Sequence, residues 1–214
     1  MSTSSLPYWP KGVPRTLNLP QVPLTHYVQV AAERFPNKPA VIFCGSTLSY
    51  AALHARVEAL AGYLTQRLGV QRGDRVLLMS QNCPQYVAAY YGIMRAGAVV
   101  VPVNAMCTPS EIRYYLQDSG ARVAMVAQEL LPQVMPLLQP GDGDALQVVL
   151  VHAYSEGLPA QPVSDEVPEV VLAPRQWLEA PGLHGLEDAI AQALPAPAEH
   201  PHSDDLCVLP YTSG

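Results

Sequence analysis

Charged side chains are scarce in this sequence, and lysine is the scarcest of them. Among 214 residues, 12 are lysine or arginine and 18 are aspartate or glutamate, which gives a formal net charge of −6. The only lysines are Lys11 and Lys38. An acidic chain without a basic cluster cannot release counterions from a polyanion, so a nucleic-acid or anionic-membrane partner is excluded. Few lysines are therefore available for a reaction that requires one.

Cysteine pairs, an apolar leader and a long apolar run are also missing. Cys44, Cys83, Cys107 and Cys207 are far apart, and none forms a Cys-x-x-Cys pair. That spacing favours reduced thiols in a cytoplasmic protein. Prolines interrupt the first twenty residues, so no secretory leader is predicted. The apolar stretch 86–107 is divided by glycine and proline, whereas a membrane span needs about 20 unbroken apolar residues.

Apolar residues, in contrast, make up 49% of the chain, which is enough for a hydrophobic core and argues against disorder. Residues 1–24 are rich in proline and predict an irregular arm lying on the body. A short helix is expected from Thr25 to the residue before Pro36. The β-rich runs 40–44 and 47–50, joined at Gly45-Ser46, predict a hairpin.

Helices and strands alternate regularly from the hairpin to residue 152. Behind Ser49, a predicted N-cap, apolar residues recur at helical spacing until Gly69 ends the helix. Strands are then expected at 75–79, 98–103, 122–127 and 147–151, with a helix between each pair. This alternation predicts βαβ units, and therefore an α/β fold with a parallel sheet flanked by helices.

Local signals mark the helix boundaries inside this pattern. Asn82 is the predicted N-cap of one helix, with proline in its first turn and Gly97 just past its end. Thr108 and Glu111 form a capping box at the start of the next helix, which Gly120 ends. A further short helix is expected at 129–138.

The pattern weakens after residue 152. Residues 153–203 contain eight prolines and predict a surface excursion with one helix, near 186–194. Order returns with a strand at 206–209, which leads into Thr212-Ser213-Gly214. Small hydroxyl residues and a glycine after a buried strand suit an anion cradle, although this tripeptide alone is more typical of an ordinary turn.

Eight short segments carry more information together than Thr-Ser-Gly does alone. They are Gly73-Asp74-Arg75-Val76, Asn82-Cys83-Pro84-Gln85-Tyr86, Gly92-Ile93-Met94-Arg95-Ala96-Gly97-Ala98, Val101-Pro102-Val103-Asn104, Thr108-Pro109-Ser110-Glu111-Ile112, Asp118-Ser119-Gly120-Ala121, Asp204-Asp205-Leu206 and Tyr211-Thr212-Ser213-Gly214. In this order and spacing, the chain resembles the amino-terminal part of the adenylate-forming acyl-CoA synthetase superfamily, also called the AMP-binding enzymes.

The resemblance implies a two-step ligase that uses ATP, Mg²⁺ and CoA. A carboxylate attacks the α-phosphate of ATP, and the CoA thiol then displaces AMP to give a thioester. Thr212, Ser213 and Gly214 match the start of the family's ATP phosphate loop and are the expected cofactor-binding residues. The rest of that loop and the family's catalytic lysine have no counterpart here, so no catalytic or metal-binding residue is assigned. We expect the 214 residues alone to be inactive.

The resemblance divides the chain into an arm at 1–24, an α/β core at 25–152, the excursion at 153–203, and a strand with the start of the phosphate loop at 204–214. The arm around Tyr8-Trp9-Pro10 favours members that act on long- or medium-chain fatty acids. Ligases for aryl, coumarate-like or amino acids share the same motifs. A stand-alone nucleotide- or partner-binding domain is the alternative from another class. The isolated chain is expected to dimerise or to be poorly soluble, because it lacks the remainder that would cover it.

Three other groups of residues invite a functional interpretation, and each has a simpler one. His200, His202, Asp204 and Asp205 have metal-ligand side chains, but they fit a solvated linker that leads into a strand. Tyrosines at helical spacing favour core packing over a binding pocket; they are Tyr86, Tyr90, Tyr91, Tyr114 and Tyr115. Cys83 and Cys107 have no histidine nearby in the sequence, so a nucleophilic role is not expected.

Overall fold

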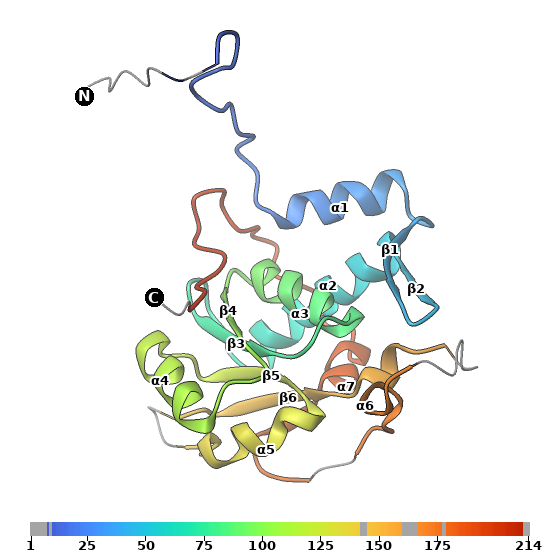
Figure 1. Ribbon diagram of the computed structural model, residues 1–214, viewed down its shortest axis with the longest axis vertical. Helices are drawn as coiled ribbons and strands as arrows, with labels where there is room; N and C mark the ends of the chain where they lie inside the picture. Colours follow the sequence, from blue (N-terminus) through green and yellow to red (C-terminus); the bar gives the residue numbers. More distant parts are fainter. Residues whose placement is uncertain (1–7, 9, 142–144, 160–166, 177–178, 212–214) are drawn as a thin grey trace.

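A parallel sheet of five strands forms the centre of the protein (Figure 1). This computed structural model describes residues 8, 10–141, 145–159, 167–176 and 179–211. In spatial order the strands are β4 (Val99–Val103), β3 (Arg75–Met79), β5 (Val123–Ala127), β6 (Val148–His152) and β7 (Leu183–Gly185). Every neighbouring pair is parallel, so the predicted α/β fold with a parallel sheet is confirmed.

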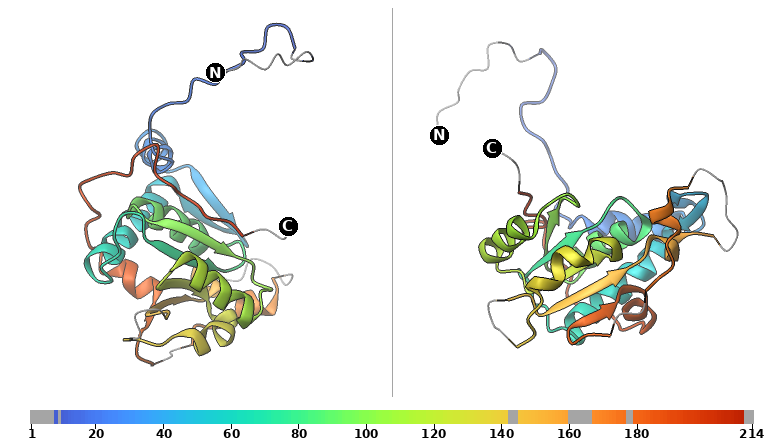
Figure 2. Two further views of the ribbon diagram at one scale, coloured as in Figure 1. Left: turned by 90° about the vertical axis from the view of Figure 1, so that its left-hand side faces the viewer. Right: turned by 60° about the horizontal axis from the view of Figure 1, so that its bottom comes forward.

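Helices cover both faces of the sheet (Figure 2). On one side are α1 (Thr25–Arg34), α2 (Tyr50–Gln66), α3 (Pro84–Arg95) and α7 (Leu186–Ala191), and on the other are α4 (Pro109–Ser119) and α5 (Leu131–Val134). Successive residues of β3 face opposite sides: Leu78 packs into the core beneath α2 and α3, and Leu77 into the core beneath α4 and α5. Both faces are buried, which explains why the strands read as continuous apolar runs.

The predicted hairpin is confirmed, but its turn lies one residue earlier than expected. Strand β1 (Pro39–Phe43) pairs antiparallel with β2 (Ser46–Ser49). The two turn residues are Cys44 and Gly45, with φ angles of +42° and +80°. Two consecutive positive φ angles suit a tight hairpin turn. Ser46 belongs to β2 instead, where it pairs with Phe43.

Most predicted helix boundaries are confirmed. The Ser49 side chain caps α2, and the Thr108–Glu111 capping box starts α4, which ends at Gly120 in the left-handed conformation. The prediction that Asn82 caps α3 is wrong. Cys83 is the N-cap residue, and its Sγ accepts a hydrogen bond from the Tyr86 backbone N–H at 3.3 Å.

The prediction of one helix at 129–138 is wrong, because prolines interrupt it. The segment consists of the 3₁₀ turn η1 (Gln128–Leu130), helix α5, and the 3₁₀ turn η2 (Met135–Leu137). Proline supplies no backbone N–H and therefore breaks the helical ladder; the residues are Pro132 and Pro136.

The proline-rich excursion contributes to the sheet, which the sequence did not indicate. It contains the 3₁₀ turn η3 (Tyr154–Gly157), the short helix α6 (Glu169–Leu172), strand β7 and helix α7. Strand β7 pairs with β6 from Leu183 to Gly185. The excursion is therefore partly built into the body.

The amino-terminal arm has no helix or strand among its described residues, as predicted. It does not lie on the body along its whole length. Residues 10–18 extend away from the rest of the protein (Figure 1), and Tyr8 is 95% exposed. Across the described residues, no helix is long and apolar enough to cross a bilayer.

Candidate functional site

The predicted cofactor-binding residues Thr212, Ser213 and Gly214 lie outside the described residues, but the segment that leads into them is described. This segment lies along the outer edge of β4. The Val100 N–H donates to the Cys207 carbonyl at 2.9 Å, and the Leu209 N–H donates to the Val100 carbonyl at 2.8 Å. These two bonds form a single parallel bridge between Val100 and Val208.

The predicted strand at 206–209 is thus reduced to one bridge, and proline explains its shortness. In a parallel ladder the next outward-facing donor of β4 would come from position 102, two residues after Val100. That position is Pro102, which has no N–H, and Pro210 likewise has none on the other chain segment.

The direction of the bridge places the site at one edge of the sheet. Because the pairing is parallel, Pro210 and Tyr211 continue toward the carboxyl end of β4. In open α/β sheets, ligands bind outside the carboxyl ends of the strands. The last described residues, Pro210 and Tyr211, therefore lie at the edge where such folds bind ligands.

Tyr211 is held against α4. Its ring stacks on Tyr115 with 4.4 Å between the ring centroids and 26° between the ring planes. Its hydroxyl donates to Asp118 Oδ2 at 2.5 Å. Partial burial, followed by the hydrogen bond to Asp118, raises the pKa of Tyr211 to about 12, so the hydroxyl remains a donor at neutral pH.

A turn before the bridge is fixed by ionic contacts. Asp205 Oδ1 accepts from the Arg72 guanidinium at 2.7 Å, and Asp205 Oδ2 accepts from the His202 backbone N–H at 2.8 Å. These hydrogen bonds, the one from Arg72 first, lower the pKa of Asp205. Asp205 therefore ties the segment to the loop that precedes β3.

The metal-ligand side chains near this turn do not gather around a common point. His202 Nδ1 lies 3.6 Å from Asp204 Oδ2, and Asp205 is directed to Arg72. Across the described ranges, no three histidine, cysteine or carboxylate groups are placed to hold an ion.

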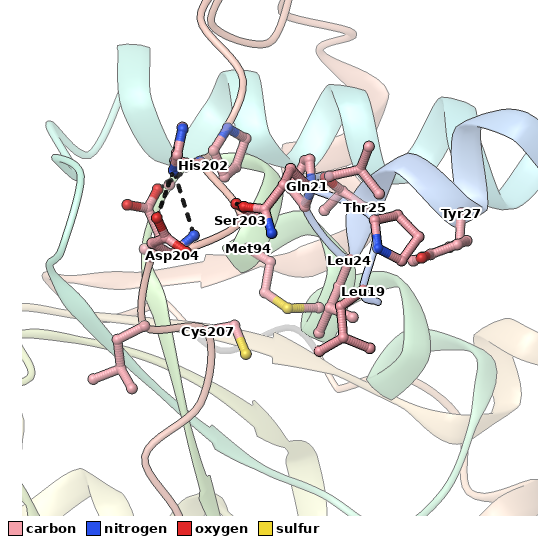
Figure 3. A pocket seen from close by; sticks show the side chains of 18 residues that line it. Leu19, Gln21, Leu24, Thr25, Tyr27, Met94, His202, Ser203, Asp204 and Cys207 are labelled. Atoms are coloured by element: carbon pink, nitrogen blue, oxygen red, sulfur yellow. Dashed lines mark hydrogen bonds and ion pairs between the residues drawn. The ribbon is translucent and has the colours of Figure 1, made fainter. Parts of the chain in front are cut away.

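A cavity of about 300 Å³ separates the arm from this turn (Figure 3). Leu19 and Leu24 lie on one side of it and His202 and Asp204 on the other, with Met94 at its floor. Acidic groups on one wall oppose an anionic ligand, and we assign no function to the cavity.

The tyrosines divide into two groups. Tyr86, Tyr90 and Tyr91 on α3 are half-buried and pack against the core, so their predicted structural role is confirmed. Tyr115 also packs against the core beneath α4, whereas Tyr114 is exposed, and both line the surface hollow that Tyr211 also lines. The sequence alone supports the same interpretation for all five tyrosines, because helical periodicity does not reveal which face of a helix a distant segment of the chain will cover.

Cys83 has a structural role at the start of α3. Cys83 is 3% exposed and caps α3, and burial raises the pKa of its thiol, which keeps it protonated. Cys44, Cys83, Cys107 and Cys207 are all free.

Two buried polar residues were not singled out from the sequence. His152, at the end of β6, is 1% exposed, and burial lowers its pKa to about 3. Among the described residues neither of its ring nitrogens has a hydrogen-bond partner. Tyr154, two positions later, donates to Glu129 and accepts from the Gln81 N–H at 3.1 Å. A histidine at the end of an apolar run was the only signal in the sequence.

Comparison with known proteins identifies the class that this fold and edge define. The family model described as AMP-binding enzyme matches residues 28–214. The chain therefore belongs to the AMP-binding enzyme family, and the resemblance noted in the sequence is confirmed.

Particular relatives sharpen this result. The chain is 34% identical over 146 residues to a long-chain-fatty-acid–CoA ligase of Bacillus subtilis, and 38% identical over 151 residues to one of Escherichia coli. The alignments cover 68% and 70% of this chain and 26% of each relative. The chain thus spans about a quarter of the length of these curated relatives.

Solved structures agree on the fold. An anthranilate CoA ligase superposes with a TM-score of 0.70 at 23% identity, covering 92% of this chain and 32% of its own. A long-chain-fatty-acid-CoA ligase from Archaeoglobus fulgidus gives a TM-score of 0.67 at 21% identity, covering 93% and 36%.

Proposed function

We propose that this chain forms the amino-terminal part of the adenylation domain of an ATP-dependent fatty acid–CoA ligase. The observation that carries the proposal is the family match, which extends from residue 28 to residue 214 and so includes the predicted phosphate-loop residues. The relatives named as long-chain-fatty-acid–CoA ligases support a fatty acid as the substrate. ATP and CoA would be the co-substrates, in keeping with a cytoplasmic enzyme.

The proposed reaction converts a carboxylate to a thioester through an acyl-adenylate. The hydroxyls of Thr212 and Ser213 and the backbone of Gly214 would contact the phosphates, at the sheet edge that Tyr211 marks. Magnesium would neutralise charge on the departing pyrophosphate. The described residues offer no carboxylate cluster for that ion, so we assign it no ligand in this chain.

The four predicted parts keep their boundaries in this proposal: the arm, the α/β core, the excursion and the start of the phosphate loop. Because the chain spans about a quarter of its relatives, we propose that the 214 residues alone do not catalyse the reaction. The remainder of the ligase would then be their partner.

Acid-dependent exchange of pyrophosphate into ATP tests the proposal. The assay compares the protein made from the gene's complete reading frame with the 214-residue chain, each with a panel of fatty, aryl, coumarate-like and amino acids. We expect exchange with fatty acids for the complete product and none for the 214-residue chain.

Each other outcome has a distinct meaning. Exchange with another acid class alone would replace the fatty-acid assignment. ATP binding without any exchange would favour the non-catalytic nucleotide-binding alternative. Exchange by the 214-residue chain would show that the chain is catalytically complete.

A further inference from the structure

Tyr211 joins two elements that are far apart in the sequence. Its hydroxyl bonds to Asp118, which is 93 positions away, and its ring stacks on Tyr115 one turn earlier in α4. Tyr114 adds an edge contact with 6.2 Å between the ring centroids. A tyrosine held by both its ring and its hydroxyl has little rotational freedom left.

The backbone beside Tyr211 is restrained independently. Leu209 is bonded to Val100 on β4, and Pro210 follows directly. Proline fixes its own φ near −65° and so limits the direction in which the chain continues. The segment is therefore fixed by β4 on one side of Pro210 and by α4 on the other.

Helix α4 is a firm support for this contact. The capping box at Thr108 fixes its start, and Ile112 and Leu116 are buried beneath it. The Ser119 hydroxyl donates to the Tyr115 carbonyl at 2.5 Å, and the Arg75 guanidinium bonds to the Ser119 carbonyl. The end of the helix that carries Tyr115 and Asp118 is thus tied to the start of β3.

We infer that Tyr115, Asp118 and Tyr211 are positioning residues that fix the base of the ATP phosphate loop. The inference rests on the proposed function. A loop that binds phosphates through backbone N–H groups is effective only when its geometry is set before the ligand arrives. Tyr211 immediately precedes Thr212, so its side chain determines where the loop begins. These residues touch no phosphate themselves and act through the backbone.

The test measures KM separately for ATP and for the acid in the complete gene product. Tyr211→Phe keeps the ring and removes the hydroxyl, and Tyr115→Leu removes the stacking partner. Asp118→Leu removes the acceptor, whereas Asp118→Asn retains one. Tyr8→Phe is the matched control, because Tyr8 is 95% exposed.

We expect Tyr211→Phe, Tyr115→Leu and Asp118→Leu each to raise the KM for ATP roughly three- to tenfold, the effect of one hydrogen bond or contact of this kind. The KM for the acid should stay unchanged. The KM for ATP of Asp118→Asn should remain near the wild-type value, because asparagine keeps a hydrogen-bond acceptor. This variant therefore distinguishes the role of the acceptor from that of the negative charge. A lower kcat with an unchanged KM for ATP would indicate a merely structural role and overturn the inference.

A second measurement does not depend on catalysis. Hydrogen–deuterium exchange at the Val100 and Leu209 amides of the complete gene product reports the restraint directly. We expect faster exchange in Tyr211→Phe and Asp118→Leu than in Tyr8→Phe, and equal rates would overturn the inference. If the complete wild-type product lacks acid-dependent exchange of pyrophosphate, the proposed function fails, while amide exchange still decides whether Tyr211 anchors the segment.

Discussion

The α/β core at 25–152 and the tail at 153–211 follow different rules of assembly. In the core, caps and glycines mark the boundaries of several helices, and strands β3 to β6 pair in parallel within one sheet. The tail reaches the same body by adding to the two edges of this sheet, with β7 beside β6 and Val208 beside Val100. Local signals therefore locate most elements of the core, while the tail depends on sheet edges that the core provides.

The largest effect is expected at the centre of the core. Leu78 on β3, an interior strand of the sheet, is fully buried between the sheet and helices α2 and α3. Leu78→Ala removes this packing and should lower the free energy of unfolding by about 2–5 kcal/mol. Urea unfolding followed by circular dichroism measures the loss. Ile42→Ala is the control, since Ile42 is 71% exposed; equal losses would contradict the assigned core.

A smaller effect is expected where the tail meets the core. A Cβ at Gly62 of α2 would lie 2.1 Å from the Leu194 carbonyl oxygen, whereas a Cβ at Gly92 of α3 would lie 2.8 Å from the Leu60 Cδ2 atom. Alanine improves helix propensity at either position by up to about 1 kcal/mol. Backbone cannot move aside as a side chain can, so Gly62→Ala should be net destabilising by about 1–3 kcal/mol.

Gly92→Ala serves as the matched variant and should cost less than Gly62→Ala. The urea midpoints of the two variants measure this difference, and amide exchange in α7 should increase only in Gly62→Ala. Equal midpoints would mean that the tail does not dock on α2 as the structure has it.

The smallest effect concerns a cap inside the core. Thr108→Ala removes the side chain that accepts from the Glu111 backbone N–H and should lower the free energy of unfolding by about 1 kcal/mol. Thr108→Ser keeps the hydroxyl and is the control.

The effect of this cap should depend on pH. Hydrogen bonds from the Thr108 backbone and then from its side chain lower the pKa of Glu111 from its usual 4.5. A carboxylate whose pKa is lowered in the folded state stabilises that state at pH values above its unfolded pKa. This stabilisation disappears as the pH falls through the lowered pKa of the folded state. The stability gap between wild type and Thr108→Ala should therefore narrow below pH 4.5. A stability difference between the two proteins that grows below pH 4.5 would contradict this prediction.

The same comparison explains what the sequence could reveal. Ser49 and Thr108 were identifiable because a cap and the N–H it bonds are three residues apart. The hairpin turn was misplaced by one residue, since Cys44 adopts a positive φ that its type rarely takes. Strand β7 was missed because three residues carry no periodicity and the strand exists only where β6 offers an edge.

The candidate site shows the same limit. The family motif pointed to Thr212, Ser213 and Gly214, but no local pattern links Tyr211 with Asp118. His152 was also invisible as a buried group, because burial depends on helices and strands that arrive from elsewhere in the chain.

The late pairing of β4 has a consequence for biosynthesis. Val100 leaves the ribosome more than a hundred residues before Val208, its partner at the outer edge. At about 5–20 residues per second, that edge waits roughly 5–20 s for its neighbour. An open strand edge invites pairing with another nascent chain. Pro102 interrupts the row of backbone N–H donors on the outer edge of β4. The same proline that limits the final pairing to one bridge therefore also disfavours pairing with another chain during synthesis.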